Sequence, residues 1–256
     1  MTQLYSEAFS GDSDLLVLLH GLGATADVWS PFVAARPGEF SGRIAVMDLP
    51  GHGTSDSLDD YAMSTVVGCV TEVLRREVGE VRDCLLLGHS YGGVAALELA
   101  DSRWGLNPRH AFGLSIKTFW TDDELAHMSR LAAKPPKKFA TEQAAIEWYQ
   151  KTTGLAGLTT HPENYTRRGV RRSSDGQWSL ALDPGVYAIA DPGMASLIDN
   201  AACPVSLAYG AGDTMIDASD MKRHDTGAQA LTGGGHNIIV THPEVVWAWI
   251  HQQLQS

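Results

Sequence analysis

The chain has 256 residues, of which 44% are hydrophobic, enough for one large domain or for a domain that carries an insertion. Its 30 acidic and 19 basic residues give a formal net charge of −11, which argues against a nucleic-acid partner. No apolar run approaches the ~20 residues that cross a bilayer, so we expect no membrane partner either.

The first part of the chain alternates short apolar runs with helical patterns. Residues 15–19, which follow Asp14, form a continuous apolar run that is typical of a strand buried on both faces of a parallel sheet. Further expected elements are a weak edge strand over residues 2–10, a helix beginning near residue 26, a buried strand over 43–47, a helix over 61–78 that Gly79 ends, and a strand over 110–116. This alternation predicts an α/β fold in which helices flank a mostly parallel sheet.

Residues 85–97 have the pattern of a strand, a tight turn and a helix. The turn has the form Gly-x-Ser-x-Gly, with Ser90 between Gly88 and Gly92. In this setting the serine sits at a sharp strand-to-helix elbow, and the glycines remove side chains that would collide there. The N-terminus of the following helix also favours negative charge beside the serine.

The buried-strand signal stops over residues 119–197. This segment contains charged helical patterns at 122–132 and 141–152, and it is too long for a plain loop. We therefore expect an inserted, mostly helical lid at 119–197, carried by an α/β core of residues 1–118 and 198–256. Because its contacts should be fewer and more local than those of the sheet, we expect the lid to open more readily than the sheet does.

The α/β pattern resumes after this segment. The expected elements are a buried strand over 204–209 with a glycine-rich turn at 210–213, a weak strand over 228–231 with a second glycine-rich turn at 233–236, and a last helix from Pro243.

Three polar residues follow predicted strands in the chain order Ser90, Asp213, His236. Because parallel strands end at the same edge of a sheet, we expect these side chains to project together. A serine hydroxyl needs an imidazole to take its proton, and a carboxylate must orient that imidazole, so the set predicts a catalytic triad. Asp217 lies later in its loop and His242 precedes a helix, which makes both weaker candidates.

Five short motifs together resemble those of the α/β-hydrolase superfamily. They are residues 20–23 (His-Gly-Leu-Gly), 48–55 (Asp-Leu-Pro-Gly-His-Gly-Thr-Ser), 88–93, 210–213 and 235–236. Within the superfamily, the chain most resembles lidded esterases and 3-oxoadipate enol-lactonase-like enzymes. The resemblance implies an oxyanion hole formed by the backbone N–H groups of Leu22 and Tyr91. His20 and His52, in the first two motifs, are expected to support these loops structurally.

Large and charged side chains near the strand ends are candidates for a substrate pocket. Trp29 and Trp120 could line an apolar pocket, and Lys117 follows a predicted strand and could reach the pocket mouth. The basic cluster over residues 167–172 could attract an acidic substrate, although a solvated lid surface is the better interpretation.

These features predict a cofactor-free serine hydrolase that cleaves a carboxylic ester, thioester or lactone through an acyl-enzyme intermediate. Two alternatives use the same triad, namely acyl transfer to an acceptor other than water and hydrolysis of a carbon–carbon bond. A third alternative is a ligand receptor that uses the hydrolase pocket only for binding. The expected partner is a small-molecule substrate, and the oligomeric state stays open.

The cysteines and the first residues indicate a compartment. Cys69, Cys84 and Cys203 are scattered and show neither a disulfide framework nor metal-ligand spacing, so we expect free thiols and no metal. Residues 1–10 contain Glu7 and no apolar stretch of signal-peptide type. Both observations favour a cytoplasmic protein.

Overall fold

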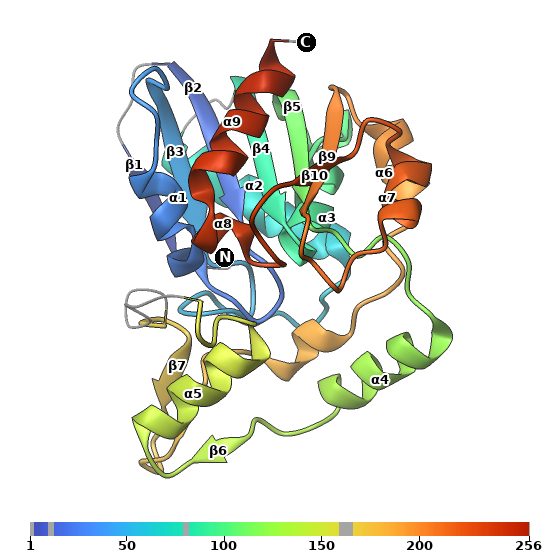
Figure 1. The fold of residues 1–256 in the computed structure, drawn as a ribbon. Helices are drawn as coiled ribbons and strands as arrows, with labels where there is room; N and C mark the ends of the chain where they lie inside the picture. Colours follow the sequence, from blue (N-terminus) through green and yellow to red (C-terminus); the bar gives the residue numbers. More distant parts are fainter. Residues whose placement is uncertain (1–2, 10–12, 79–81, 159–165, 256) are drawn as a thin grey trace.

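The computed structural model describes residues 3–9, 13–78, 82–158 and 166–255. Its main element is a seven-stranded sheet with the order β1-β3-β2-β4-β5-β9-β10, in which β1 is antiparallel to β3 and the other neighbours are parallel (Figure 1). The strands are β1 Ser6–Phe9, β2 Ser13–Leu19, β3 Gly42–Met47, β4 Arg82–His89, β5 Asn107–Leu114, β9 Val205–Gly210 and β10 Gln229–Leu231. The predicted α/β fold with a mostly parallel sheet is therefore confirmed.

Helices cover both faces of this sheet. One face packs against α2 Met63–Val78, α3 Tyr91–Leu99, α6 Met194–Asn200 and α7 Ala218–His224. The other face packs against η1 Ala26–Trp29, α1 Ser30–Ala34, α8 Ile238–Thr241 and α9 Pro243–Leu254. A short 3-10 turn, η2 Ser102–Trp104, follows α3. None of the described helices is long and apolar enough to span a bilayer.

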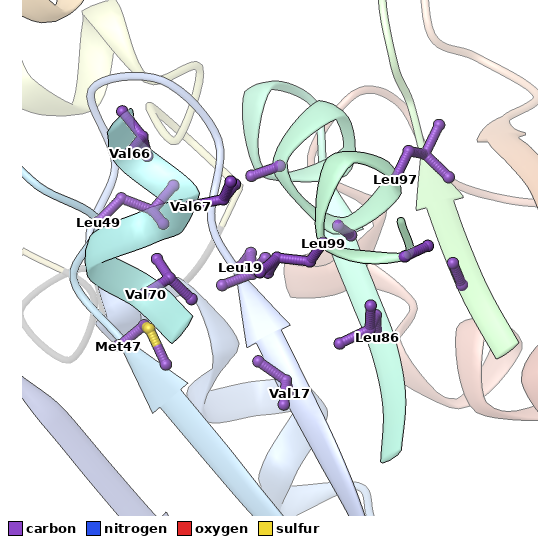
Figure 2. Close-up of a cluster of buried hydrophobic side chains, with 14 of the residues drawn as sticks. Val17, Leu19, Met47, Leu49, Val66, Val67, Val70, Leu86, Leu97 and Leu99 are labelled. Carbon is purple, nitrogen blue, oxygen red and sulfur yellow. The ribbon is translucent and has the colours of Figure 1, made fainter. Parts of the chain in front are cut away.

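The continuous apolar run in β2 serves both faces. Val17 and Leu19 point into the cluster with α2 and α3, which Figure 2 shows, whereas Leu16 and Leu18 belong to the cluster with α9. All four side chains are fully buried. A strand with helices on both faces needs apolar residues at every position, which explains why alternation is absent from its sequence.

The segment 119–197 crosses beneath one end of the sheet (Figure 1). Its elements are α4 Asp122–Ala132, β6 Lys138–Phe139, α5 Glu142–Thr152, β7 Val170–Arg172, β8 Trp178–Leu180 and η4 Pro184–Tyr187, followed by α6. The two predicted helices are confirmed as α4 and α5. The segment also contains a small antiparallel sheet, β6-β8-β7, which was not predicted, so it is not purely helical. Its strands are only two or three residues long and half-exposed, which leaves no apolar run to recognise.

Outside this segment the predicted elements agree with the observed ones to within a few residues, and α7 and α8 were not anticipated. Both are short, at seven and four residues. Gly79, expected to end α2, lies outside the described residues.

Candidate active site

Ser90 lies between β4 and α3 in a backbone conformation that a serine rarely adopts, with φ 54° and ψ −119°. The surrounding chain leaves no room for a relaxed turn. A Cβ on Gly88 would collide with the carbonyl of Gly92, and a Cβ on Gly92 would collide with that of Leu19. The Ser90 N–H donates to the Leu114 carbonyl at 2.8 Å and so fixes the turn to β5. Strain of this kind persists where the neighbouring structure over-determines it, and such positions cluster at functional sites.

Two backbone N–H groups near Ser90 are available to a ligand. Tyr91 is the first residue of α3, where helix geometry leaves its N–H without a helical acceptor, and Leu22 follows β2 in the turn beside the elbow. Neither N–H donates a hydrogen bond within the described parts of the chain. A Cβ placed on Gly21, next to Leu22, would lie 3.3 Å from the Ser90 Cβ, so this turn and the elbow are adjacent.

Asp213 and His236 are brought together by two glycine-rich turns. The Gly212 N–H donates to the Gly234 carbonyl at 2.8 Å, and His236 Nδ1 donates to Asp213 Oδ2 at 2.9 Å. The Asp213 carboxylate is fully buried. Burial alone would raise the pKa of Asp213, but its hydrogen bonds to His236 and the Met215 N–H hold this pKa below its usual value. With the proton on Nδ1, the Nε2 lone pair of His236 is available as a base.

The elbow and the histidine turn are in direct contact through His89. Its ring centroid lies 4.8 Å from that of His236, and its Nε2–H donates to the His236 carbonyl at 2.8 Å. Burial lowers the pKa of His89 to about 3, so this donor is a neutral imidazole at neutral pH. No local sequence pattern indicates this bond, because its partner is 147 residues away in the chain.

His20 and His52 support the turn that contains Leu22. His20 accepts from the Leu49 N–H at 2.9 Å, and His52 accepts from the Gly23 N–H at 3.1 Å. Each ring donates its Nδ1–H to a nearby carbonyl. Burial lowers the pKa of His20 to about 4 and that of His52 to about 3, which keeps both rings neutral and able to accept. The structural role expected for these histidines is confirmed.

Arg168 differs from the other arginines of the 167–172 cluster. It is largely buried, with Nη2 2.6 Å from Asp27 Oδ1 and Nε 3.5 Å from Asp48 Oδ2. Burial raises the pKa of both carboxyl groups, and the guanidinium of Arg168 acts in the opposite direction. Arg168 therefore neither attracts substrate nor forms a solvated surface, but pins the inserted segment to the core. The remaining arginines, Arg167, Arg171 and Arg172, are exposed.

The expected pocket residues lie in two different environments. Trp29 is fully buried in the cluster under α9 and packs edge-on against Phe32 at 5.5 Å, so its pocket assignment is wrong. Trp120 and Lys117 are half-buried and adjacent, with Lys117 Nζ 5.1 Å from the Trp120 ring and 2.7 Å from Glu124 Oε1. Periodicity could not separate a core tryptophan from a pocket tryptophan, because both are apolar residues near strand ends.

The described residues contain no group of three or more histidine, cysteine, aspartate or glutamate side chains arranged to hold a metal ion. Cys69, Cys84 and Cys203 are free thiols.

Two named proteins share sequence with this chain. Protein phosphatase methylesterase 1 from Bos taurus is 30% identical over 152 residues, 57% of this chain and 40% of that protein. The chain thus spans less than half the length of that relative. The pimeloyl-(acyl-carrier protein) methyl ester esterase from Nitrosospira multiformis is 25% identical over 256 residues, 99% of this chain and 87% of that protein.

Solved structures and family models give the same fold. The crystal structure of E-2-(acetamidomethylene)succinate hydrolase superposes with a TM-score of 0.79 at 16% identity, covering 100% of this chain and 96% of that chain. At this identity the likeness shows the fold alone. The model of the alpha/beta hydrolase family matches residues 16–249. Since that match covers nearly the whole chain, the protein belongs to the alpha/beta hydrolase family.

Proposed function

We propose that the protein is a serine hydrolase that cleaves a carboxylic ester, thioester or lactone. One observation supports this most strongly: a strained serine lies beside two backbone N–H groups that have no acceptor among the described residues. It also lies against a histidine turn in which the imidazole is bonded to a buried carboxylate. The two named relatives are methylesterases, which makes small alkyl esters the first substrates to test.

In the proposed reaction, the Ser90 oxygen attacks the substrate carbonyl carbon while His236 Nε2 takes the hydroxyl proton. The carbonyl electron pair moves onto oxygen, where the N–H groups of Leu22 and Tyr91 stabilise it. When the tetrahedral intermediate collapses, its bond to the leaving alcohol or thiol breaks and His236 donates the proton to that group. Water then attacks the acyl-enzyme by the same steps, which releases the carboxylic acid and restores Ser90.

Asp213 holds the imidazole in the tautomer that this reaction requires. Its bond to Nδ1 leaves Nε2 free to accept the proton of Ser90, and its negative charge stabilises the imidazolium that results. The buried position of the carboxylate strengthens this interaction, because water does not screen it. Losing this orientation through Asp213→Asn is expected to cost roughly 10⁴-fold in turnover.

We propose further that residues 119–197 act as a lid that forms part of the substrate site. Trp120, at the start of this segment, and Lys117, just before it, are the candidates for contact with substrate. A closed lid would exclude water from the reacting ester, which strengthens every electrostatic interaction inside the site. A lid that admits an alcohol or amine in place of water would turn the same chemistry into acyl transfer.

The proposal is tested by trapping the nucleophile and then measuring turnover. A fluorophosphonate should label the wild-type protein at Ser90 and nowhere else, as peptide mapping by mass spectrometry would show. Ser90→Ala should lose both labelling and hydrolysis of methyl esters, thioesters and lactones, whereas Ser102→Ala, which changes an exposed serine, should retain both. Labelling at another residue, or full turnover by folded Ser90→Ala, would contradict the proposal.

A further inference from the structure

The backbone around His236 is held by hydrogen bonds to two separate parts of the chain. His89 donates to the His236 carbonyl at 2.8 Å. The next residue, Asn237, donates its Nδ2–H to the Thr153 carbonyl at 2.9 Å. Thr153 is the C-cap of α5 and lies 84 residues away in the chain, inside the inserted segment.

The end of α5 is an acceptor that needs a donor. The last carbonyls of an α-helix have no partner within the helix, and they carry the negative end of its dipole. The side-chain amide of Asn237 satisfies one of these carbonyls while being almost fully buried. Gly154 makes room for it, because a Cβ at this residue would lie 3.0 Å from Asn237 Nδ2 and its φ is +69°.

The same helix end also lies against the turn that contains Leu22. The Thr153 Cγ2 atom is 3.9 Å from the position a Cβ would take on Gly23, the residue after Leu22. One turn of α5 thus touches both the turn proposed to hold the oxyanion and the turn that carries His236. Residues from two distant parts of the chain meet on this single helix end.

α5 is held on the core, so its hydrogen bonds and contacts can fix the positions of these two turns. Tyr149, one turn before its end, is almost fully buried in the cluster beneath α9. Its ring fills the space beside Gly169, where any Cβ would collide with it. The adjacent residue Arg168 binds Asp27 and Asp48 of the core. The helix end is therefore held on the core by both packing and charge.

We propose that Asn237 is a positioning residue, through which the docked helix α5 holds His236 in place for proton transfer. The inference rests on the proposed function of His236 as the base that activates Ser90. Its consequence is that docking of the inserted segment and alignment of the imidazole are linked. A change that lifts the end of α5 releases the histidine turn on one side, even though no residue of α5 takes part in the reaction.

Two variants of Asn237 separate hydrogen bonding from packing. Asn237→Ala removes the donor and the volume, whereas Asn237→Asp keeps the shape but replaces the donor with an acceptor that faces a carbonyl. Thr152→Ala is the matched control, because the bonds of this exposed side chain within the described residues go to carbonyls of its own helix. All proteins are compared at the plateau of their pH–rate profiles, and urea unfolding establishes that each variant is folded.

Both Asn237 variants should lower kcat by roughly 10- to 100-fold, because small displacements of a catalytic group are costly, while KM changes little. Their rates of labelling by a small fluorophosphonate should fall by a similar factor, since labelling also needs an aligned base. Thr152→Ala should match the wild type in all respects. Wild-type kcat and labelling in Asn237→Asp would overturn the inference, as would a change in KM alone.

A spectroscopic measurement keeps this test separate from the proposed function. The proton shared by His236 Nδ1 and Asp213 should give a downfield ¹H NMR resonance in the wild type and in Thr152→Ala. It should broaden or disappear in both Asn237 variants, because the histidine turn is no longer fixed. If the wild type neither turns over esters nor labels at Ser90, the proposed function fails, and a resonance unchanged by Asn237→Ala would independently refute the positioning role.

Discussion

The helices α4 and α5 of the inserted segment look alike in sequence but lie in different surroundings. Each has 11 residues, and each begins with a threonine whose side chain accepts from a backbone N–H three residues later. Yet α4 has no buried residue, whereas α5 buries Ala145 and Tyr149, and Tyr149 belongs to the core cluster beneath α9. Figure 1 shows α4 apart from α5, on the opposite side of the segment.

The docked part of the segment, residues 141–187, is tied to the core by its backbone as well as its side chains. Asp183 donates its N–H to the Gly51 carbonyl at 2.8 Å, and the Gly53 N–H donates to the Ala181 carbonyl at 2.7 Å. The Tyr61 hydroxyl donates to Asp183 Oδ2 at 2.9 Å. These bonds join the segment to the 48–55 motif and so to the turns around Ser90.

The arm formed by residues 119–140 has weaker attachments. α4 packs mainly against η4, another part of the inserted segment. The ion pair between Lys117 and Glu124 is partly exposed to solvent, where such pairs contribute little. We therefore expect the inserted segment to move as two parts and not as one lid. Mobility should be concentrated in the arm, while the docked part behaves as an extension of the core.

The largest expected effect appears in the wild-type protein, by hydrogen exchange. Amides of α4 should exchange through local opening that costs little free energy, whereas amides of α5 should be protected to nearly the global free energy of unfolding. The difference should therefore amount to several kcal/mol, since global stabilities are about 5–15 kcal/mol. Mass spectrometry of peptides over 122–132 and 142–152 measures it. Equal protection of both helices would remove the distinction between arm and docked part.

Arg168→Met should detach the docked part and lower the free energy of unfolding by about 3–5 kcal/mol, because it leaves two buried carboxylates without their cation. Urea unfolding with global spectroscopic probes measures this loss. Arg167→Met is the control. The side chain of Arg167 is exposed, so this variant should lose little free energy of unfolding. A mild effect of Arg168→Met would mean that packing of Tyr149 alone holds the segment.

Acid should weaken the turns around the site and the docked part before it affects the arm. The folded-state pKa values, about 4 for His20 and about 3 for His52, lie below the unfolded value of 6.5. The folded state therefore binds fewer protons than the unfolded state. The contribution of the two histidines to the free energy of unfolding is complete above pH 6.5 and is lost as the pH falls towards 4. We expect a loss of roughly 2–3 kcal/mol per histidine by pH 4.5, measured by urea unfolding. His20→Gln should flatten this dependence, and an unaltered slope in that variant would contradict the assignment.

The two N-cap threonines offer the finest comparison. Removing either cap should cost about 1 kcal/mol of helix stability. For Thr121→Ala this cost should appear only as faster exchange within α4, with the global unfolding midpoint unchanged. For Thr141→Ala it should appear in the global free energy of unfolding, because α5 opens only with the core. A global loss in both variants would show that the arm unfolds cooperatively with the rest.

Local sequence signals were sufficient for much of the fold and for the candidate residues of the site. The apolar run of β2 and the helical spacing of α2 and α9 predicted those elements because burial requires apolar residues at fixed intervals. Ser90, Asp213 and His236 could be selected because each follows a strand at a glycine-rich turn, and the structure places Asp213 and His236 2.9 Å apart.

Other features depended on contacts between residues that are far apart in the chain. Trp29 could not be assigned to the core, nor Arg168 to its ion pairs, before Phe32, Asp27 and Asp48 were placed beside them. The bond from Asn237 to Thr153 has no local signature, because an asparagine after a histidine satisfies its amide in many ways. The sequence by itself determined which elements form and which residues end their strands, since propensity and periodicity act over a few residues. The tertiary structure alone decided which part of the inserted segment is docked, because docking depends on partners that only the packed chain brings within hydrogen-bonding distance.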